Sequence, residues 1–150
     1  MNNRFALESM SISFIKSPLS EVKEEMKSIV FTSLNEKWKR NQYKLTDSSG
    51  LTSFILESDF DAVKILLWQP KSVNFDLVVF LTNMSDGWQT ILNVYFNQFQ
   101  REFLRVKLSD DFRDYPAYLF EYIKTSNHRI VQAMKDSDKW FFFESGVIMS

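Results

Sequence analysis

The first part of the chain changes from a two-residue to a three-or-four-residue spacing of apolar positions. Residues Ser11–Lys16 alternate between apolar and polar side chains, which predicts a short strand. Ser17 and Pro18 suit the N-cap and the first position of a helix. From there to about Arg40 we expect a helix with one buried face. That face carries Val22, Met26, Ile29, Val30, Leu34 and Trp38.

Two apolar runs in the middle of the chain predict further strands. The run Lys64–Trp68 is stopped by Pro70. The run Phe75–Leu81 is rich in β-branched and aromatic residues and has little polar alternation. A strand of that composition is typical of the centre of a sheet, where both faces are covered.

A second helix is predicted after the turn residues Ser85–Gly87. Its apolar positions keep helical spacing from Trp88 to Phe99. Its opposite face is polar but uncharged, whereas a solvent-facing helix usually carries Lys and Glu. We therefore expect this face to contact protein, either another element of the chain or a partner. The face consists of Gln89, Thr90, Asn93, Asn97, Gln98 and Gln100.

The remaining sequence alternates with a period of two and predicts strands. One is expected at Arg101–Leu108 and another at Tyr118–Lys124. Residues Arg129–Lys135 and Trp140–Glu144 are expected to form a hairpin around Asp136–Asp138. The sequence thus predicts a single α+β domain spanning residues 1–150, with two main helices packed on a mostly antiparallel sheet of five to seven strands.

Composition narrows the chemistry that this fold can carry. The chain has no cysteine, one histidine and three glycines, while 16% of its residues are aromatic. Thiolate nucleophiles, Cys/His metal clusters and Gly-rich phosphate loops are therefore excluded or poorly represented. The net charge of −1 argues against general binding to nucleic acid or anionic membranes. Glu8 interrupts any signal-peptide core and no apolar run is long enough to span a membrane, so we expect a cytoplasmic protein.

Isolated chemical groups fit structural roles better than catalytic ones. His128 could act as a general base, but no companion residue stands at a recognisable spacing. Asp110–Asp111 and Asp136/Asp138 could hold a cation, yet acidic pairs are common in solvated turns. The basic and aromatic run Lys37–Arg40 could contact nucleic acid, but it also suits a helix C-terminus. We expect no enzyme activity, no cofactor and no metal.

Two acidic segments are the candidate partner-binding surfaces. The window Leu45–Val63 contains four acidic residues and no Lys or Arg. A solvated loop would explain this composition, and so would a loop that steers a basic partner. The candidate contact residues are Glu57, Asp59, Asp61, Asp110, Asp111 and Asp114.

Several short motifs in residues 75–146 together suggest a family. They are Asp86–Trp88, the strand around Val106, Tyr115–Ala117, Arg129–Asp136 and Trp140–Gly146. This pattern resembles small bacterial immunity proteins of polymorphic or contact-dependent toxin systems. The resemblance implies a non-enzymatic inhibitor that binds a cognate toxin domain and blocks its active site or substrate path. Nuclease toxins are commonly basic, so an acidic inhibitor surface would complement one.

Two other functions remain open at this stage. The first is a small-ligand-binding or enzymatic α+β domain in which Phe and Tyr side chains line a pocket. The second is an oligomeric structural module that pairs through the Asn/Gln helix face or an edge strand. For the immunity protein we expect a monomer or weak dimer.

Overall fold

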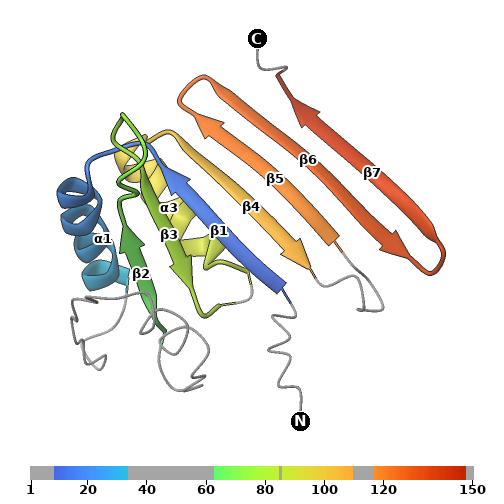
Figure 1. Ribbon diagram of the computed structural model, residues 1–150, viewed down its shortest axis with the longest axis horizontal. Coiled ribbons are helices and arrows are strands. Elements are labelled where there is room, and N and C mark those ends of the chain that lie inside the picture. The colour runs from blue at the N-terminus through green and yellow to red at the C-terminus, as the bar shows by residue number, and fades with distance from the viewer. Residues whose placement is uncertain (1–8, 34–62, 85, 110–116, 148–150) are drawn as a thin grey trace.

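The computed structural model describes residues 9–33, 63–84, 86–109 and 117–147. The two described helices and seven described strands form an α+β arrangement (Figure 1). In chain order these elements are β1 (Ser9–Ile15), α1 (Leu19–Ser33), β2 (Ile65–Trp68), β3 (Val78–Thr82), α3 (Gln89–Phe99), β4 (Phe103–Ser109), β5 (Ala117–Lys124), β6 (Asn127–Asp136) and β7 (Lys139–Gly146).

All the described strands belong to one seven-stranded antiparallel sheet, with the order β2-β3-β1-β4-β5-β6-β7. The first four strands and both described helices have the connectivity β-α-β-β-α-β of the split βαβ motif. Strands β5, β6 and β7 then extend this sheet as a meander of hairpins. The α+β class and mostly antiparallel sheet that the sequence predicts are confirmed.

Both helices pack on the same face of the sheet. Their buried side chains join the odd-numbered residues Ile15, Phe103 and Ile123 in one core, together with Val78 and Phe80. The helix side chains in this core are Val22, Met26, Ile29, Ile91, Leu92 and Tyr95. The side of the sheet that carries Phe103 and Ile123 is called the helix face below, and the other side the open face.

A polar cluster joins the two helices at the edge of this core. The hydroxyl of Tyr95 donates a hydrogen bond of 2.6 Å to Glu25 Oε2. Arg101 donates from Nε to both oxygens of Glu25 and from Nη2 to Glu21 at 2.7 Å. Burial of the Tyr95 ring, reinforced by the Glu25 carboxylate, raises the pKa of its hydroxyl. The hydroxyl therefore stays protonated and serves as a hydrogen-bond donor between α3 and α1.

The predicted hairpin is confirmed, and the first helix begins at Leu19, one residue after the predicted first helical position Pro18. The carbonyl of Pro18 accepts hydrogen bonds from the amides of Glu21 and Val22 as α1 begins. Within the described residues α1 ends at Ser33, so the predicted continuation to Arg40 lies outside them. Asp136–Asp138 forms the β6–β7 turn, where Ser137 has a left-handed φ of 55°.

Strand β3 is the covered central strand that the sequence predicts, with a shifted start. All its residues are buried. It begins at Val78 and not at Phe75, which lies in the β2–β3 connection and is exposed. The apolar character of Phe75 therefore does not reflect burial in the described part of the chain.

Strand β4 reverses the usual orientation of an alternating strand. Phe103 and Arg105 lie on the helix face and are buried, whereas Leu108 lies on the open face and is exposed. Arg105 can occupy the covered face because Glu121 stands opposite it on β5. Leu104 and Val106 also lie on the open face, so three of the four apolar side chains of β4 point away from the helices and only Phe103 points toward them.

The entry to α3 requires glycine at position 87. Gly87 has a φ of 67°, and a Cβ built there would stand 2.3 Å from Ser11 Oγ on β1. Trp88 follows with a φ of 54°, and its amide donates to Asp86 Oδ1 at 2.9 Å. These contacts close the turn that the sequence predicts before the second helix.

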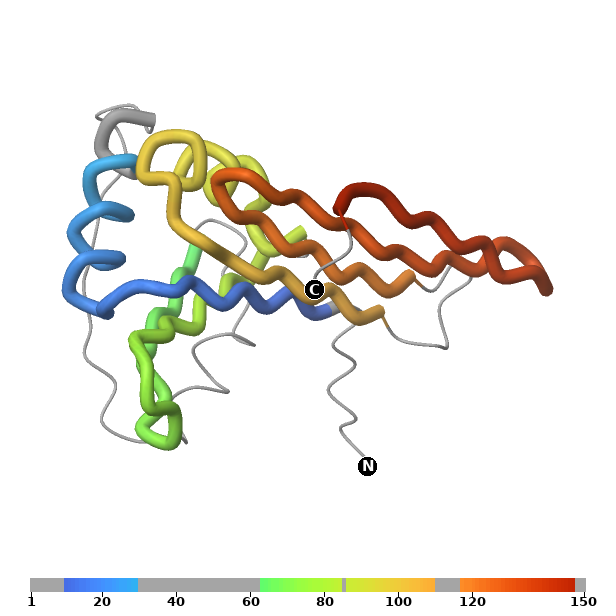
Figure 2. The backbone as a smooth tube through the Cα atoms, turned by 90° about the horizontal axis from the view of Figure 1, so that it is seen from above, coloured from blue at the N-terminus to red at the C-terminus, as the bar shows by residue number. Residues whose placement is uncertain are grey.

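The meander β5–β7 extends beyond the part of the sheet that the described helices cover. Figure 2 shows the helices grouped at one end, with β6 and β7 projecting away from them. None of the side chains of β7 is buried. The C-terminal hairpin is consequently the most exposed part of the described sheet.

Candidate functional site

Strand β7 carries four consecutive exposed aromatic side chains at the edge of the sheet. Trp140, Phe141, Phe142 and Phe143 are 42%, 56%, 80% and 55% exposed. Alternation along the strand places Trp140 and Phe142 on the open face and Phe141 and Phe143 on the helix face. Contiguous apolar surface of this kind is characteristic of interaction sites in soluble proteins.

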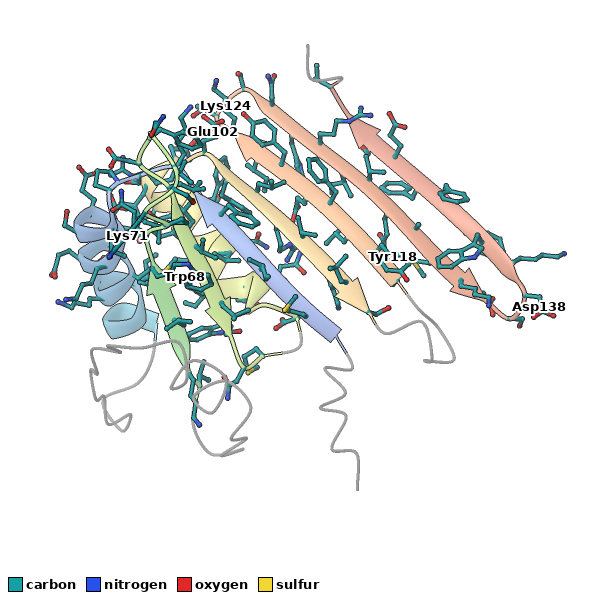
Figure 3. The ribbon with its side chains drawn as sticks, in the orientation of Figure 1. Trp68, Lys71, Glu102, Tyr118, Lys124 and Asp138 are labelled. Carbon is teal, nitrogen blue, oxygen red and sulfur yellow. The ribbon has the colours of Figure 1, made fainter. Side chains whose placement is uncertain are left out.

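On the open face these side chains continue into a larger apolar surface, which we call the aromatic platform. The strand register places Leu108, Tyr118, Ala133 and Phe142 side by side across four strands. The rings of Tyr118 and Trp140 stack with centroids 5.8 Å apart and an interplanar angle of 23°. Figure 3 shows Tyr118 on β5, with Asp138 marking the tip of the adjoining β6–β7 hairpin. The platform consists of Leu108, Tyr118, Phe120, Val131, Trp140 and Phe142.

The helix face of the same hairpin is also apolar. Phe141 stands opposite Met134, and both are exposed. A strand with solvent on one face normally has polar residues on that face. Strand β7 has large apolar residues on both faces. Its sequence therefore fits a strand that is covered when another protein binds.

A buried ion pair supports the sheet where the meander begins. Arg105 Nη2 lies 2.5 Å from Glu121 Oε2, and both side chains are almost fully buried. His128, on the neighbouring strand β6, places its Nε2 3.0 Å from Glu121 Oε1. The strand pairing therefore supplies the companion carboxylate that no sequence spacing indicated for His128. Because Arg105 and His128 both contact the Glu121 carboxylate, this group links strands β4, β5 and β6.

A hollow of about 450 Å³ lies between α3 and the β5–β6 turn. Asn93, Phe96 and Asn97 form the α3 side, and residues 123–128 form the other. The Asn/Gln face of α3 is exposed in the described structure, so no described element covers it. Among the described residues of the lining, Phe96 is the one Phe, Tyr or Trp, and the others are mostly polar. This differs from the Phe- and Tyr-lined cavity expected for a ligand-binding domain.

A second polar cluster surrounds Glu102, which lies just before β4 at the upper ends of the middle strands in Figure 3, where Lys124 lies nearby. Tyr122 Oη donates to Glu102 Oε1 at 2.8 Å, and Lys16 Nζ donates to Oε2 at 3.3 Å. Burial opposes ionisation of Glu102, but these hydrogen bonds and the positive charges of Lys16 and Lys124 outweigh it. The pKa of Glu102 is therefore lowered.

This lowered pKa gives a pH-dependence that can be measured. A carboxyl with a lower pKa in the folded state stabilises the protein fully above its unfolded pKa and loses that contribution as the pH falls through the folded value. We expect Glu102→Gln to lower the free energy of unfolding at about pH 7 and to flatten its decline between about pH 5 and pH 3. Urea unfolding across this range measures the slope.

Tyr122→Phe is the matched control for that experiment. It keeps the charge of Glu102 but removes one hydrogen bond, so the acid slope should lie between those of the native protein and Glu102→Gln. An unchanged slope in Glu102→Gln would show that other carboxylates dominate acid unfolding.

The acidic residues predicted as partner contacts lie outside the described residues. This applies to Glu57, Asp59 and Asp61 and equally to Asp110, Asp111 and Asp114. The aromatic residues of β7 are the surface that sequence reasoning did not single out. Their signal was the run Trp140–Phe143, whose apolar character continues through four positions where an exposed edge strand would alternate.

No family model, curated protein or solved structure matches this chain. Within the described ranges, no helix combines the length and apolar character needed to cross a bilayer. No group of three or more His, Asp or Glu residues is placed to hold a metal in those same ranges.

Proposed function

We propose that this protein is a non-enzymatic protein-binding module that docks its partner on the aromatic platform. The observation that carries the proposal is the exposure of Trp140 and Phe142 on a sheet face that the described helices leave open. Tyr and Trp side chains supply much of the binding energy at protein interfaces, because they bury large areas with little conformational entropy. The stacked pair Tyr118 and Trp140 offers such an anchor in a preformed geometry.

The narrower form of the proposal is an immunity protein that neutralises a cognate bacterial toxin in the cytoplasm. It is supported by the sequence resemblance and by the exposed apolar surface of the aromatic platform. In this form, Glu57, Asp59, Asp61, Asp110, Asp111 and Asp114 supply charge that attracts a basic toxin domain, while the platform supplies the anchors.

The test begins with capture of the partner from the native bacterium on tagged protein, followed by binding measurements with the purified partner. Trp140→Ala should weaken the complex by about 2 kcal/mol, or about 30-fold in Kd. Phe75→Ala is the matched control, because Phe75 is an exposed aromatic residue in the β2–β3 connection, away from the platform. Equal losses for the two variants would contradict docking on the platform.

The acidic residues and the toxin assignment are tested by two separate experiments. Charge reversal at Asp59 and Asp61 should weaken binding by at least about 1 kcal/mol, mainly through slower association. Co-expression must also rescue cells from the captured partner if that partner is a toxin. Binding without rescue would keep the protein-binding module and remove the immunity function.

Small-ligand binding is the second candidate, favoured by the hollow beside α3. The aromatic residues argue for the first candidate, because the described β7 rings project outward and do not line this hollow. Ligand-induced thermal stabilisation that is lost in Asn97→Ala, with Gln98→Ala as control, would favour the second.

A further inference from the structure

Strand β7 is an unprotected edge. Its inner side pairs with β6 without interruption. The register runs from the pair of Asp136 with Lys139 to the pair of Arg129 with Gly146. No described strand pairs with its outer side. Natural edge strands are usually short or interrupted by proline, bulges or central charges, because free backbone groups attract other strands. The opposite edge strand, β2, follows this rule with four residues, whereas β7 has eight and carries aromatic residues at its centre.

We propose that β7 pairs antiparallel with β7 of a second copy of this chain, about a two-fold axis through Phe142. An axis perpendicular to the sheet keeps the open face of one copy continuous with the open face of the other. Even-numbered residues must then stand opposite even-numbered residues, so the axis has to pass through a residue and not between two. This requirement leaves few possible registers.

The register centred on Phe142 matches the side chains best. It places Phe142 opposite its own copy and Phe141 opposite Phe143 of the second copy, which gives aromatic cross-strand pairs on both faces. Lys139 then faces Ser145 of the second copy, and Trp140 faces Glu144, so no like charges oppose each other. Pairing extends from Lys139 to Ser145.

Neighbouring registers are less complementary. An axis through Phe143 would place Trp140 opposite Gly146 and Phe142 opposite Glu144, which removes most aromatic pairs. An axis through Phe141 would stop the pairing at Phe143 and place it opposite Lys139. In the central register Glu144 faces Trp140 and needs no cation from the second copy, because Arg129 of its own chain already pairs with it.

This pairing would join the platforms of the two copies. Trp140 and Phe142 of both chains would lie side by side on one continuous open face. Each copy would then contribute residues to the surface on which the partner protein docks. That consequence rests on the proposed function. The pairing itself does not, because it concerns the purified chain alone.

Light scattering after size-exclusion chromatography tests the pairing. The native chain should show a concentration-dependent dimer. Phe142→Lys and Phe142→Glu should each be monomeric at concentrations where the native chain is dimeric, because like charges would face each other across the axis. An equimolar mixture of the two variants should recover a heterodimer. Met134→Lys, an exposed apolar position on β6 away from the edge, is the matched control and should remain dimeric.

Single cysteines test the register directly, since the native chain has none. Opposed Cα atoms in an antiparallel pair lie about 4.5–5.5 Å apart, within the span of a disulfide. Phe142→Cys should cross-link with itself under oxidation, whereas Phe141→Cys should cross-link efficiently only when mixed with Phe143→Cys. A monomeric mass across the concentration series would overturn the pairing, and self-linking of Phe141→Cys as fast as Phe142→Cys would overturn the register.

Discussion

Glu121→Leu is expected to lower the free energy of unfolding by about 3–5 kcal/mol, among the largest effects of any single substitution in this chain. The cost arises because Arg105 would remain charged and buried on the helix face without its counterion. Removing one member of a buried pair costs much more than the pair contributes, since desolvation of the remaining charge is uncompensated. Urea unfolding followed by circular dichroism measures the change.

The double variant Arg105→Met/Glu121→Leu separates this cause from a general packing defect. Replacing both charges by apolar side chains of similar volume should recover most of the lost stability. His128→Asn removes only the partly exposed contact with Glu121 and should have a small effect. A double variant as unstable as the single one would show that the shape of Glu121, and not the orphaned charge, matters.

Phe80→Ala is expected to cost about 3–5 kcal/mol, because it opens a cavity in the core beneath both helices. Phe80 is 1% exposed and belongs to the central core with Tyr95 and Phe103. The expected loss combines the transfer free energy of the ring with the dispersion contacts that its neighbours lose. Urea unfolding measures it, and an unchanged m-value would show that the unfolded state is not altered.

Phe142→Ala is the matched control for this prediction. It removes the same ring from a position that is 80% exposed, so the monomer should lose no more than about 0.5 kcal/mol. The measurement is made at low protein concentration, where self-association does not contribute. A large loss for Phe142→Ala would mean that the ring is part of the core, which would contradict its proposed role as a contact residue.

Local periodicity predicted most elements because each strand and helix keeps its own spacing. It could not determine which side of β4 faces the helices. Arg105 and Phe103 alternate with Leu104 and Val106, and the apolar count alone favours placing the leucine side inward. The pairing of β4 with β1 and β5 sets the orientation instead. Glu121 allows Arg105 to be buried on the helix face because it supplies the counterion. That information lies in residues far apart in the sequence.

The sequence allowed the type of residue in the candidate site to be predicted, but not the position of these residues in the sheet. The abundance of aromatic residues suited packing and protein recognition equally well, and the pattern Trp140–Phe143 indicated a strand. Only the strand order shows that this strand lies at the edge, where the same residues are exposed and not central. Similarly, His128 and Glu121 are brought together by the β5–β6 register, which no motif spacing encodes.

The uneven distribution of helices over the sheet has a consequence for hydrogen exchange. Amides in β1 and β3 lie beneath the core, so their exchange requires opening on the scale of the whole domain. Among the described strands β7 pairs only with β6, and the side chains of β7 are exposed, whereas β6 also pairs with β5. Release of β7 from β6 would therefore cost far less than global unfolding. A partner or second copy bound at β7 would slow exchange in the hairpin while leaving the core amides nearly unchanged.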